Sequence, residues 1–374
     1  MNETKSGNHF IRLRRGLPRV NAKLAGNEPL AVAFLGGSIT EGAGASDSEK
    51  TSWRALTGRF FKERFLTGEV ISINAGVGGT TSTFGAHRLQ EHVFAHGQID
   101  LLFVEFSVND GRDREESIKG MEGIVRQCRR LSPQTDICFV YTAADKNLTG
   151  ELPFNIAVHE EVAVHYDIPS VSFAAPIYEQ IQCGQLLWKE LANDGVHPND
   201  IGHALYALFL QEFLVIALLP GVREDDGQNT LTLPPPLHNQ NYEYASMTDF
   251  RLADHPAEFY VNKLEDEPLM NWRFNTEHLF TDVHHASLSF SADGQSAGLL
   301  LLCGPGTGIF EYSFDGSTFH QVNLFDEWCL IAYRPVIAMF PLPAERTNTR
   351  IIIRNTGLKD ERSKGTELRI LKLL

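Results

Sequence analysis

The chain has 374 residues, enough for two domains that each bury a core of their own. Hydrophobic residues make up 43% and charged residues 21%, which is typical of a globular protein and excludes a disordered or mainly membrane-embedded chain. The formal net charge of −14 disfavours nucleic acid and anionic membrane surfaces as partners.

No targeting or membrane segment is recognisable. Residues 1–29 are predicted as an N-terminal extension, and they lack the run of about 7–15 apolar residues found in a secretory signal. The longest apolar stretch, residues 204–220, is interrupted by Gln211 and Glu212 and is shorter than the roughly 20 residues that span a bilayer. The chain has 5 cysteines and no CxxC pair, which favours reduced thiols. We therefore expect a cytoplasmic protein with a core helix at this stretch.

The first half of the chain alternates between strand-like and helical patterns. The strand-like segments are Ala31–Leu35, Val70–Asn74, Leu101–Phe106, Ile137–Tyr141 and Ser170–Phe173. The helical segments are Trp53–Phe65, Phe84–Ala95, Glu115–Leu131, Phe154–Tyr166 and a closing helix from Asn199 to Leu218. Such alternation predicts βαβ units and a parallel sheet covered on both faces. Residues 30–219 are therefore predicted as a three-layer α/β domain.

After Pro220 the composition changes. Residues 220–240 are acidic and then proline-rich, which predicts a linker. Beyond it come short alternating segments separated by turn signals such as Asp293-Gly294: Ala286–Ser291, Gly298–Cys303, Gly308–Phe314, Trp328–Tyr333, Val336–Phe340, Thr349–Ile353 and Glu367–Leu373. Many short strands of this kind indicate an all-β sandwich, jelly-roll-like, over residues 241–374.

A serine follows two glycines at the end of the first predicted strand. The apolar run from Leu30 to Leu35 stops at Gly36-Gly37, and Ser38 comes next. A buried parallel strand that ends in this way delivers a hydroxyl group to the edge of the sheet, at the turn into the next helix.

Other polar residues occupy equivalent positions along the chain. They are Gly78-Gly79-Thr80-Thr81 after the second strand, Asn109-Asp110 after the third, and Asp194 and His197 before the closing helix. Open α/β sheets bind ligands outside the carboxyl ends of their strands. We therefore expect these residues to converge on Ser38.

The residue types match the needs of acyl transfer. A nucleophilic hydroxyl requires a base, and the base requires a partner that fixes its tautomer. His197 can accept the proton of Ser38, and Asp194 can hold the other ring nitrogen. The backbone N–H groups of Ser38 and Gly79 and the side-chain amide of Asn109 can stabilise the oxyanion. These residues predict a serine hydrolase.

Four sequence blocks resemble those of the SGNH (GDSL-type) hydrolases. They are Gly-Gly-Ser38-Ile-Thr, Asn74-Ala-Gly-Val-Gly-Gly79-Thr-Thr-Ser, Val-Glu-Phe-Ser-Val-Asn109-Asp and Asp194-Gly-Val-His197-Pro, in the order of that family. The resemblance covers residues 30–218 and implies a flavodoxin-like hydrolase fold. It also implies that Ser38 is the nucleophile, Gly79 and Asn109 are oxyanion donors, and Asp194 and His197 are the partners of the serine.

Two positions depart from the family pattern. Gly37 stands where the family usually has aspartate, a residue that is not the nucleophile. Ser107-Val108 precede Asn109 where Gly-Thr or Gly-Gly is common, so the loop around the acyl pocket is expected to differ.

Further residues are candidates for contact with the substrate: Gly37, Glu41, Trp53, Asp110 and Trp188. Glu41 could shape the mouth of the pocket, and the two tryptophans could form walls of a sugar site. The alternatives are a solvated loop position for Asp110 and ordinary core or rim positions for Trp53 and Trp188.

No metal or organic cofactor is expected. His87, His92 and His96 have near-helical spacing, but no cysteine or carboxylate completes a ligand set. We interpret them as an exposed polar helix face.

The predicted function is hydrolysis of short-chain acyl esters, most simply acetyl groups on a carbohydrate, through an acyl-serine intermediate. The carbohydrate part rests on fold-level analogy with SGNH enzymes that carry an all-β partner domain. The expected partner is a small-molecule or oligosaccharide ester, and a homo-oligomer is left open. The alternatives are a lipid esterase, phospholipase or thioesterase with a longer acyl pocket, and a non-catalytic glycan-binding protein.

Overall fold

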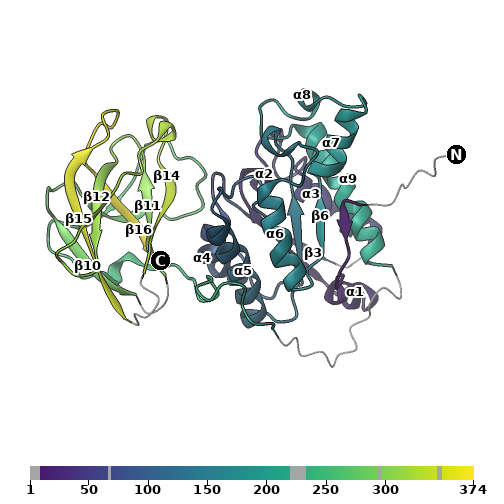
Figure 1. Ribbon diagram of the computed structural model, residues 1–374, viewed down its shortest axis with the longest axis horizontal. Coiled ribbons are helices and arrows are strands. Elements are labelled where there is room, and N and C mark those ends of the chain that lie inside the picture. The colour runs from purple at the N-terminus through teal and green to yellow at the C-terminus, as the bar shows by residue number, and fades with distance from the viewer. Residues whose placement is uncertain (1–8, 66–68, 220–232, 293–295, 343–347) are drawn as a thin grey trace. The chain divides into compact units, whose positions relative to one another are not determined.

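The computed structural model describes residues 9–65, 69–219, 233–292, 296–342 and 348–374. It divides into two compact units, residues 1–243 and 244–374 (Figure 1). The first unit is α/β and the second is built from antiparallel sheets, which confirms the predicted fold class. Residues 220–232 of the expected linker and the Asp293-Gly294 turn lie outside the described residues.

The first unit is built on a six-stranded sheet in the order β1-β6-β5-β4-β2-β3. Five strands are parallel: β2 (Leu30–Gly36), β3 (Val70–Gly76), β4 (Leu101–Glu105), β5 (Asp136–Tyr141) and β6 (Ser170–Ser172). The short β1 (Ile11–Arg12) pairs antiparallel with β6. Every residue of β4 and β5 is buried, which explains why their sequences are almost continuously apolar.

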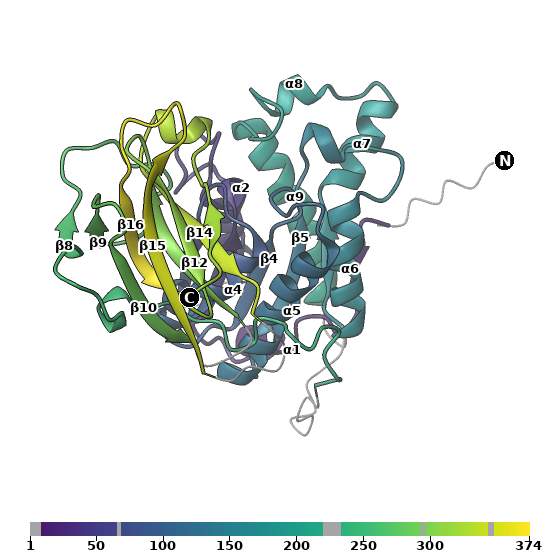
Figure 2. The same cartoon turned by 60° about the vertical axis from the view of Figure 1, so that its left-hand side comes forward.

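Helices cover both faces of this sheet. The larger ones are α3 (Trp53–Phe65), α4 (Ser82–His92), α5 (Arg114–Leu131), α6 (Phe154–His165), α7 (Ala174–Gln182) and α9 (Asp200–Ala217). α4, α5 and α6 pack side by side on one face, whereas α3 packs against α9 on the other (Figures 1 and 2). The structure confirms the predicted three layers.

Several elements were not predicted. Residues placed in the N-terminal extension contribute β1 and the helix α1 (Pro18–Ala25), which contacts β2 and β5. Two four-residue helices, α2 (Ser38–Glu41) and α8 (Trp188–Leu191), lie at the same end of the sheet (Figure 2). Helices this short carry no periodicity that a sequence pattern could reveal.

The apolar helix α9 belongs to the core of this unit. Its length and composition would allow it to cross a membrane, but half of it is buried inside the unit. It packs against α3 and β6, as expected for a core helix.

The end of the expected linker is attached to α5. The Glu122 carboxylate accepts hydrogen bonds from the backbone N–H groups of Leu237 (2.6 Å) and His238 (2.8 Å). Arg126 pairs with Glu243 at 2.6 Å, and Tyr242 packs against Gly123. Residues 233–243 are therefore part of the first unit.

The second unit consists of two antiparallel sheets. One has the order β10-β15-β12-β13 and the other β14-β11-β16-β9-β8, with β7 paired to β16. The strands are β7 (Thr248–Asp249), β8 (Tyr260–Lys263), β9 (Glu277–Thr281), β10 (Ser287–Ala292), β11 (Ala297–Cys303), β12 (Gly308–Ser313), β13 (His320–Val322), β14 (Arg334–Phe340), β15 (Thr349–Lys359) and β16 (Leu368–Leu373).

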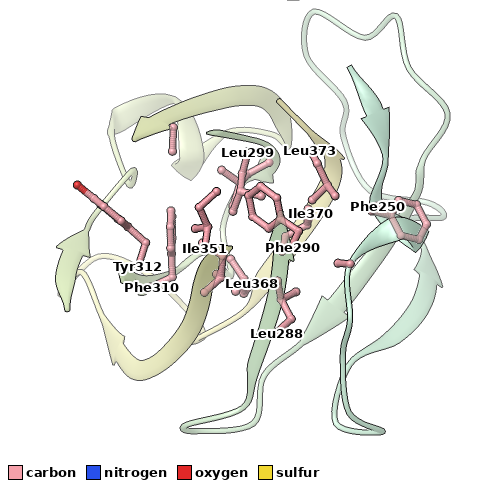
Figure 3. Close-up of a cluster of buried hydrophobic side chains, with 14 of the residues drawn as sticks. Phe250, Leu288, Phe290, Leu299, Phe310, Tyr312, Ile351, Leu368, Ile370 and Leu373 are labelled. Atoms are coloured by element: carbon pink, nitrogen blue, oxygen red, sulfur yellow. The ribbon is translucent and has the colours of Figure 1, made fainter. Parts of the chain in front are cut away.

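The core of this unit is formed by side chains from both sheets. Figure 3 shows Phe290, Leu299, Phe310, Ile351 and Ile370 within one buried cluster. Residues next to Ile351 on β15, such as Arg350, are exposed, as the alternation of a strand requires. The predicted sandwich is confirmed.

One predicted strand is wrong. Residues 328–332 are not paired with a strand, Tyr333 forms an isolated bridge with Leu269, and a 3-10 turn spans Glu327–Leu330. The Asp326 carboxylate caps this turn by accepting hydrogen bonds from the backbone N–H groups of Trp328 (3.1 Å) and Cys329 (3.2 Å). Trp328 is 48% exposed, so the apolar sequence here does not form the buried face of a strand. Local capping overrides the strand pattern.

Candidate active site

The turn between β2 and α2 positions Ser38. Gly37 caps α2, and Ser38 is its first residue, half-buried at the carboxyl edge of the sheet. A Cβ atom on Gly37 would lie 2.1 Å from Oδ1 of Asn109, so a larger residue at this position would have to displace the Asn109 amide. Gly37 therefore brings the serine turn against the loop that carries Asn109.

Ser38, His197 and Asp194 form one hydrogen-bonded series. Ser38 Oγ lies 2.9 Å from Nε2 of His197, and Nδ1 of the same ring lies 2.8 Å from Oδ2 of Asp194. The imidazole is 34% exposed and the carboxylate 55% exposed. Neutral His197 with its proton on Nδ1 donates to Asp194 and accepts from the Ser38 hydroxyl. This is the arrangement in which a serine can lose its proton to a base.

Asp194 is held in its ionised form. Partial burial acts to raise its pKa, but hydrogen bonds from the backbone N–H and ring of His197 and from the Val196 N–H lower the pKa to about 2. The second oxygen, Oδ1, accepts from the N–H groups of Val196 (2.7 Å) and His197 (2.6 Å). The loop thus fixes the carboxylate that orients the ring.

Trp188 supports this loop. It is the first residue of α8, is partly exposed, and its indole N–H donates to the Asp194 carbonyl at 3.2 Å. Trp188 therefore contacts the loop that carries Asp194 and His197, which we call the base loop. Its predicted contact with substrate stays a prediction.

Three N–H donors are candidates for the oxyanion site: the backbone N–H groups of Ser38 and Gly79 and the side-chain amide of Asn109. Gly79 is exposed and has a φ of 70°, a left-handed conformation that favours glycine. Asn109 is half-buried in the loop after β4, with its amide against Gly37. Within the described residues, no hydrogen-bond acceptor is paired with the Ser38 or Gly79 backbone N–H groups or with the Asn109 Nδ2 group. These donors are available to an oxyanion.

Glu41 contacts the loop that carries Gly79. Its carboxylate accepts a hydrogen bond from the Gly78 N–H at 3.0 Å, and its backbone carbonyl accepts one from the Asn74 side chain at 3.2 Å. This bond holds the Val77–Gly78 peptide, which directly precedes the peptide that carries the Gly79 N–H. The suggested place of Glu41 at the pocket mouth is compatible with its partial exposure.

Trp53 occupies the core position that the sequence left open as the alternative to a wall of the substrate site. Its side chain is completely buried and stacks edge-on against Phe34, Phe103 and Phe173. The indole N–H donates to the Ile39 carbonyl at 3.2 Å. Trp53 therefore supports the serine turn from inside the core.

Asp110 is wrong as a substrate contact and as a solvated loop position. It is 5% exposed and accepts hydrogen bonds from Ser82 (2.7 Å), Ser117 (2.8 Å) and His159 (2.9 Å). Although burial acts to raise its pKa, the bonds from His159 and Ser82 hold that pKa below its ordinary value. Asp110 ties the oxyanion loop to α4, α5 and α6.

Sequence reasoning missed the polar contacts under the site. Glu105 at the end of β4 is 1% exposed and accepts from Thr40 on α2 (3.0 Å) and Thr142 after β5 (2.8 Å). Burial raises its pKa, although both hydroxyls lower it. The sequence signal that could have revealed this residue is the presence of a carboxylate at the end of an otherwise apolar strand. Glu105 links the serine turn to the segment after β5.

The predicted exposed histidine face is wrong for His87, whereas His92 is half-buried and His96, beyond the end of α4, is exposed as predicted. His87 is 1% exposed, its Nδ1 lies 2.8 Å from the Thr83 carbonyl, and its ring lies against Tyr242. Burial lowers its pKa to about 4, so the ring is neutral. Docking of residues 233–243 on this side of the unit covers a helix face that the sequence alone assigned to solvent.

The comparison with protein families finds one match. Residues 34–205 match the GDSL-like Lipase/Acylhydrolase family. This range contains Ser38, Gly79, Asn109, Asp194 and His197. No curated protein sequence matches the chain significantly.

Two similar solved structures are of a two-domain esterase (CEX) active on acetylated mannans, one of them co-crystallized with mannopentaose. Each is 23% identical and covers 97% of this chain, and the matches extend over 97% and 98% of that protein. The TM-scores are 0.79 and 0.78. The likeness shows that both units of this chain have the fold of that esterase.

Proposed function

We propose that this chain is an ester hydrolase that removes acetyl groups from carbohydrates. The match of residues 34–205 to the GDSL-like Lipase/Acylhydrolase family supports the hydrolase activity. The observation that carries the chemistry is the series of hydrogen bonds from Ser38 through His197 to Asp194. Free N–H donors on the adjacent loops support the same reaction.

In the first half of the reaction, Ser38 Oγ attacks the carbonyl carbon of the ester while Nε2 of His197 takes the hydroxyl proton. The carbonyl oxygen becomes an oxyanion, held by the Ser38 and Gly79 N–H groups and the Asn109 amide. As the intermediate collapses, His197 gives its proton to the leaving alcohol oxygen, and acetyl-serine remains.

In the second half, a water molecule repeats the attack on the acetyl-serine carbonyl. His197 accepts one proton from this water and returns it to Ser38 Oγ as acetate leaves. Asp194 stays ionised throughout and stabilises the imidazolium that forms in each half-reaction.

The preference for a short acyl group is supported by the loops around Ser38. The loop that carries Gly79 has five residues, 77–81, between the end of β3 and the start of α4. The turn after β4 closes on itself by hydrogen bonds from the Asn109 and Asp110 N–H groups to the Phe106 carbonyl. Neither loop carries an apolar insertion that would lengthen an acyl pocket.

The choice of a carbohydrate as the alcohol is supported by fold similarity. The esterase with the matching two-domain fold is described as active on acetylated mannans. An acetylated oligosaccharide is accordingly the proposed substrate class.

Acetate release from acetylated oligosaccharides tests the proposal. We expect turnover of these substrates and a fall in rate from acetyl to butyryl to octanoyl p-nitrophenyl esters. Ser38→Ala should abolish both activities with little change in the thermal midpoint, because Ser38 is half-buried and its hydroxyl bonds, among the described residues, only to His197. A retained rate would end the assignment of the nucleophile, and rates that rise with chain length would favour a lipid esterase.

A further inference from the structure

The loop that carries Asn109 is held by its backbone carbonyls. The Phe106 carbonyl accepts from the Asn109 and Asp110 N–H groups at 3.0 and 2.9 Å. Asn155 on α6 donates to the carbonyls of Ser107 and Asp110. The remaining bond comes from a different segment, since the Lys146 ammonium group donates to the Val108 carbonyl.

This last bond controls a single peptide plane. The Val108–Asn109 peptide presents its carbonyl to Lys146 and its N–H to the Phe106 carbonyl, so both polar groups of the plane are engaged. The following peptide plane is also held, by the Asp110 N–H bond to the Phe106 carbonyl at 2.9 Å. Two planar peptides held on either side of Asn109 restrict its φ and ψ, and so the direction in which its Cα–Cβ bond leaves the backbone. The side chain so directed is the amide of Asn109, which has no room to move toward Gly37.

The residue before Lys146 does the same for the base loop. The backbone N–H of Asp145 donates to the Gly195 carbonyl at 2.8 Å. The N–H of the same peptide belongs to Val196 and donates to Asp194 at 2.7 Å. Two consecutive residues of one 3-10 turn, Asp145–Asn147, thus hold one peptide plane in each catalytic loop.

The 145–147 turn is itself anchored in the core. Asn147 is 5% exposed and its side chain bonds to both the Ala144 N–H (2.7 Å) and the Thr142 carbonyl (2.8 Å). The Thr142 hydroxyl donates to Glu105, which also accepts from Thr40 beside the nucleophile. The 145–147 turn and the serine turn are therefore both connected by hydrogen bonds to the buried Glu105 carboxylate.

We propose that Lys146 is a positioning residue of the esterase, which acts through the Val108–Asn109 peptide to aim the Asn109 amide at the oxyanion. Lys146 is exposed, but the next residue, Asn147, is buried and anchors the turn. The backbone from which the Lys146 side chain reaches the Asn109 loop is therefore held in place. The inference rests on the proposed oxyanion role of Asn109. It assigns to Lys146 an effect on the transition state and none on ground-state binding.

Lys146→Met, Lys146→Arg, Asn109→Ala and the double variant test this in the full-length chain with p-nitrophenyl acetate. Lys146→Met should lower kcat roughly tenfold with KM within about twofold, a fraction of the 10²–10³ expected for losing an oxyanion donor outright. Lys146→Arg retains a cationic donor and should restore most of kcat. In the Asn109→Ala background the Lys146→Met change should have an effect of less than about twofold, because residues that act as one unit are non-additive.

Lys62→Met is the matched control. Lys62 is an exposed lysine near the end of α3, so it removes the same charge away from the carboxyl edge of the sheet. It should leave kcat unchanged, and the thermal midpoints of both lysine variants should equal that of the parent.

Three results would overturn the proposal. An unchanged kcat in Lys146→Met, or a change confined to KM, would remove Lys146 from positioning. Equal losses from Lys146→Met with and without Asn109 would mean that the lysine acts independently of the amide. If Asn109→Ala itself kept full kcat, the oxyanion role would fail along with this inference, whereas loss of activity in Ser38→Ala would still support the esterase.

Discussion

At the scale of single residues, the site depends on close contact between two turns. Gly37 and the Asn109 amide approach so closely that a methyl group would overlap the amide oxygen. That oxygen is buried without a hydrogen-bond partner among the described residues, which leaves the amide nitrogen as the group directed to the site. Packing here decides where a catalytic donor points.

Gly37→Ala should therefore impair catalysis. The added Cβ would lie 2.1 Å from Asn109 Oδ1 and must displace the amide, so we expect kcat for p-nitrophenyl acetate to fall by roughly 10², as for loss of an oxyanion donor. Gly111→Ala is the control, because a Cβ there meets nothing within 4 Å. Equal kcat values in the two variants would contradict the proposed position of the amide.

The acid limb of the pH–rate profile should report one group. Asp194, with a pKa of about 2, stays ionised above about pH 4, so within the catalytic triad only the base can take up a proton in that range. Log kcat/KM should consequently fall with a slope of one as the pH decreases toward about 4. A slope approaching two in this range would mean that the carboxylate also titrates there.

At the scale of elements, short segments of the first unit are joined by buried polar groups. Asp136 begins β5, is 4% exposed, and accepts a hydrogen bond from the Val20 N–H of α1 at 2.9 Å. Burial raises its pKa from 3.8 to about 7, against the bond from Val20 and the charge of Arg129. The folded protein therefore binds a proton here that the unfolded chain has already lost.

Asp136 should make stability depend on pH. Because its pKa is raised on folding, its favourable contribution is complete below about pH 3.8 and is lost as the pH rises through about 7. Asp136→Asn keeps an acceptor for Val20 and does not titrate. Urea unfolding at pH 5 and pH 8 should show that the parent loses more unfolding free energy over this interval than the variant. Parallel losses would contradict the raised pKa.

Elements with a clear period were predicted well. The range of α3 agrees with its prediction, and α5, α6 and α9 differ at their ends by a residue or so. The Trp328–Tyr333 segment failed because its apolar residues are consecutive rather than facing one side, and a capping carboxylate at Asp326 decides its conformation. Local hydrogen bonds to side chains leave no periodic signal.

At the scale of the whole molecule, every residue assigned to catalysis lies in the first unit, which extends to Glu243. Residues 233–243 belong to it through Glu122, Arg126 and Tyr242. The second unit has its own sheets and its own core. The chemical step is accordingly expected to need the first unit alone.

A chain that ends at Glu243 should hydrolyse p-nitrophenyl acetate with a kcat/KM within about twofold of the full chain. A chain that ends at Leu219 should melt at a lower temperature than the one ending at Glu243, because Glu122 loses the N–H donors of Leu237 and His238 and α5 loses its contact with Tyr242. Equal thermal midpoints for the two shortened chains would show that residues 233–243 contribute nothing to stability.

The amino-acid sequence alone determined the alternation of strands and helices, the division into an α/β and an all-β unit, and the grouping of Ser38, Asp194 and His197. Each of these follows from hydrophobic periodicity or from the position of a polar residue at the end of an apolar strand. Only the tertiary structure decided that Trp53 and Asp110 are buried and that Lys146 contacts the oxyanion loop. These burials and contacts depend on residues that are distant in the sequence and become neighbours only in the folded chain. The residues adjacent in sequence to Trp53, Asp110 or Lys146 therefore do not reveal them.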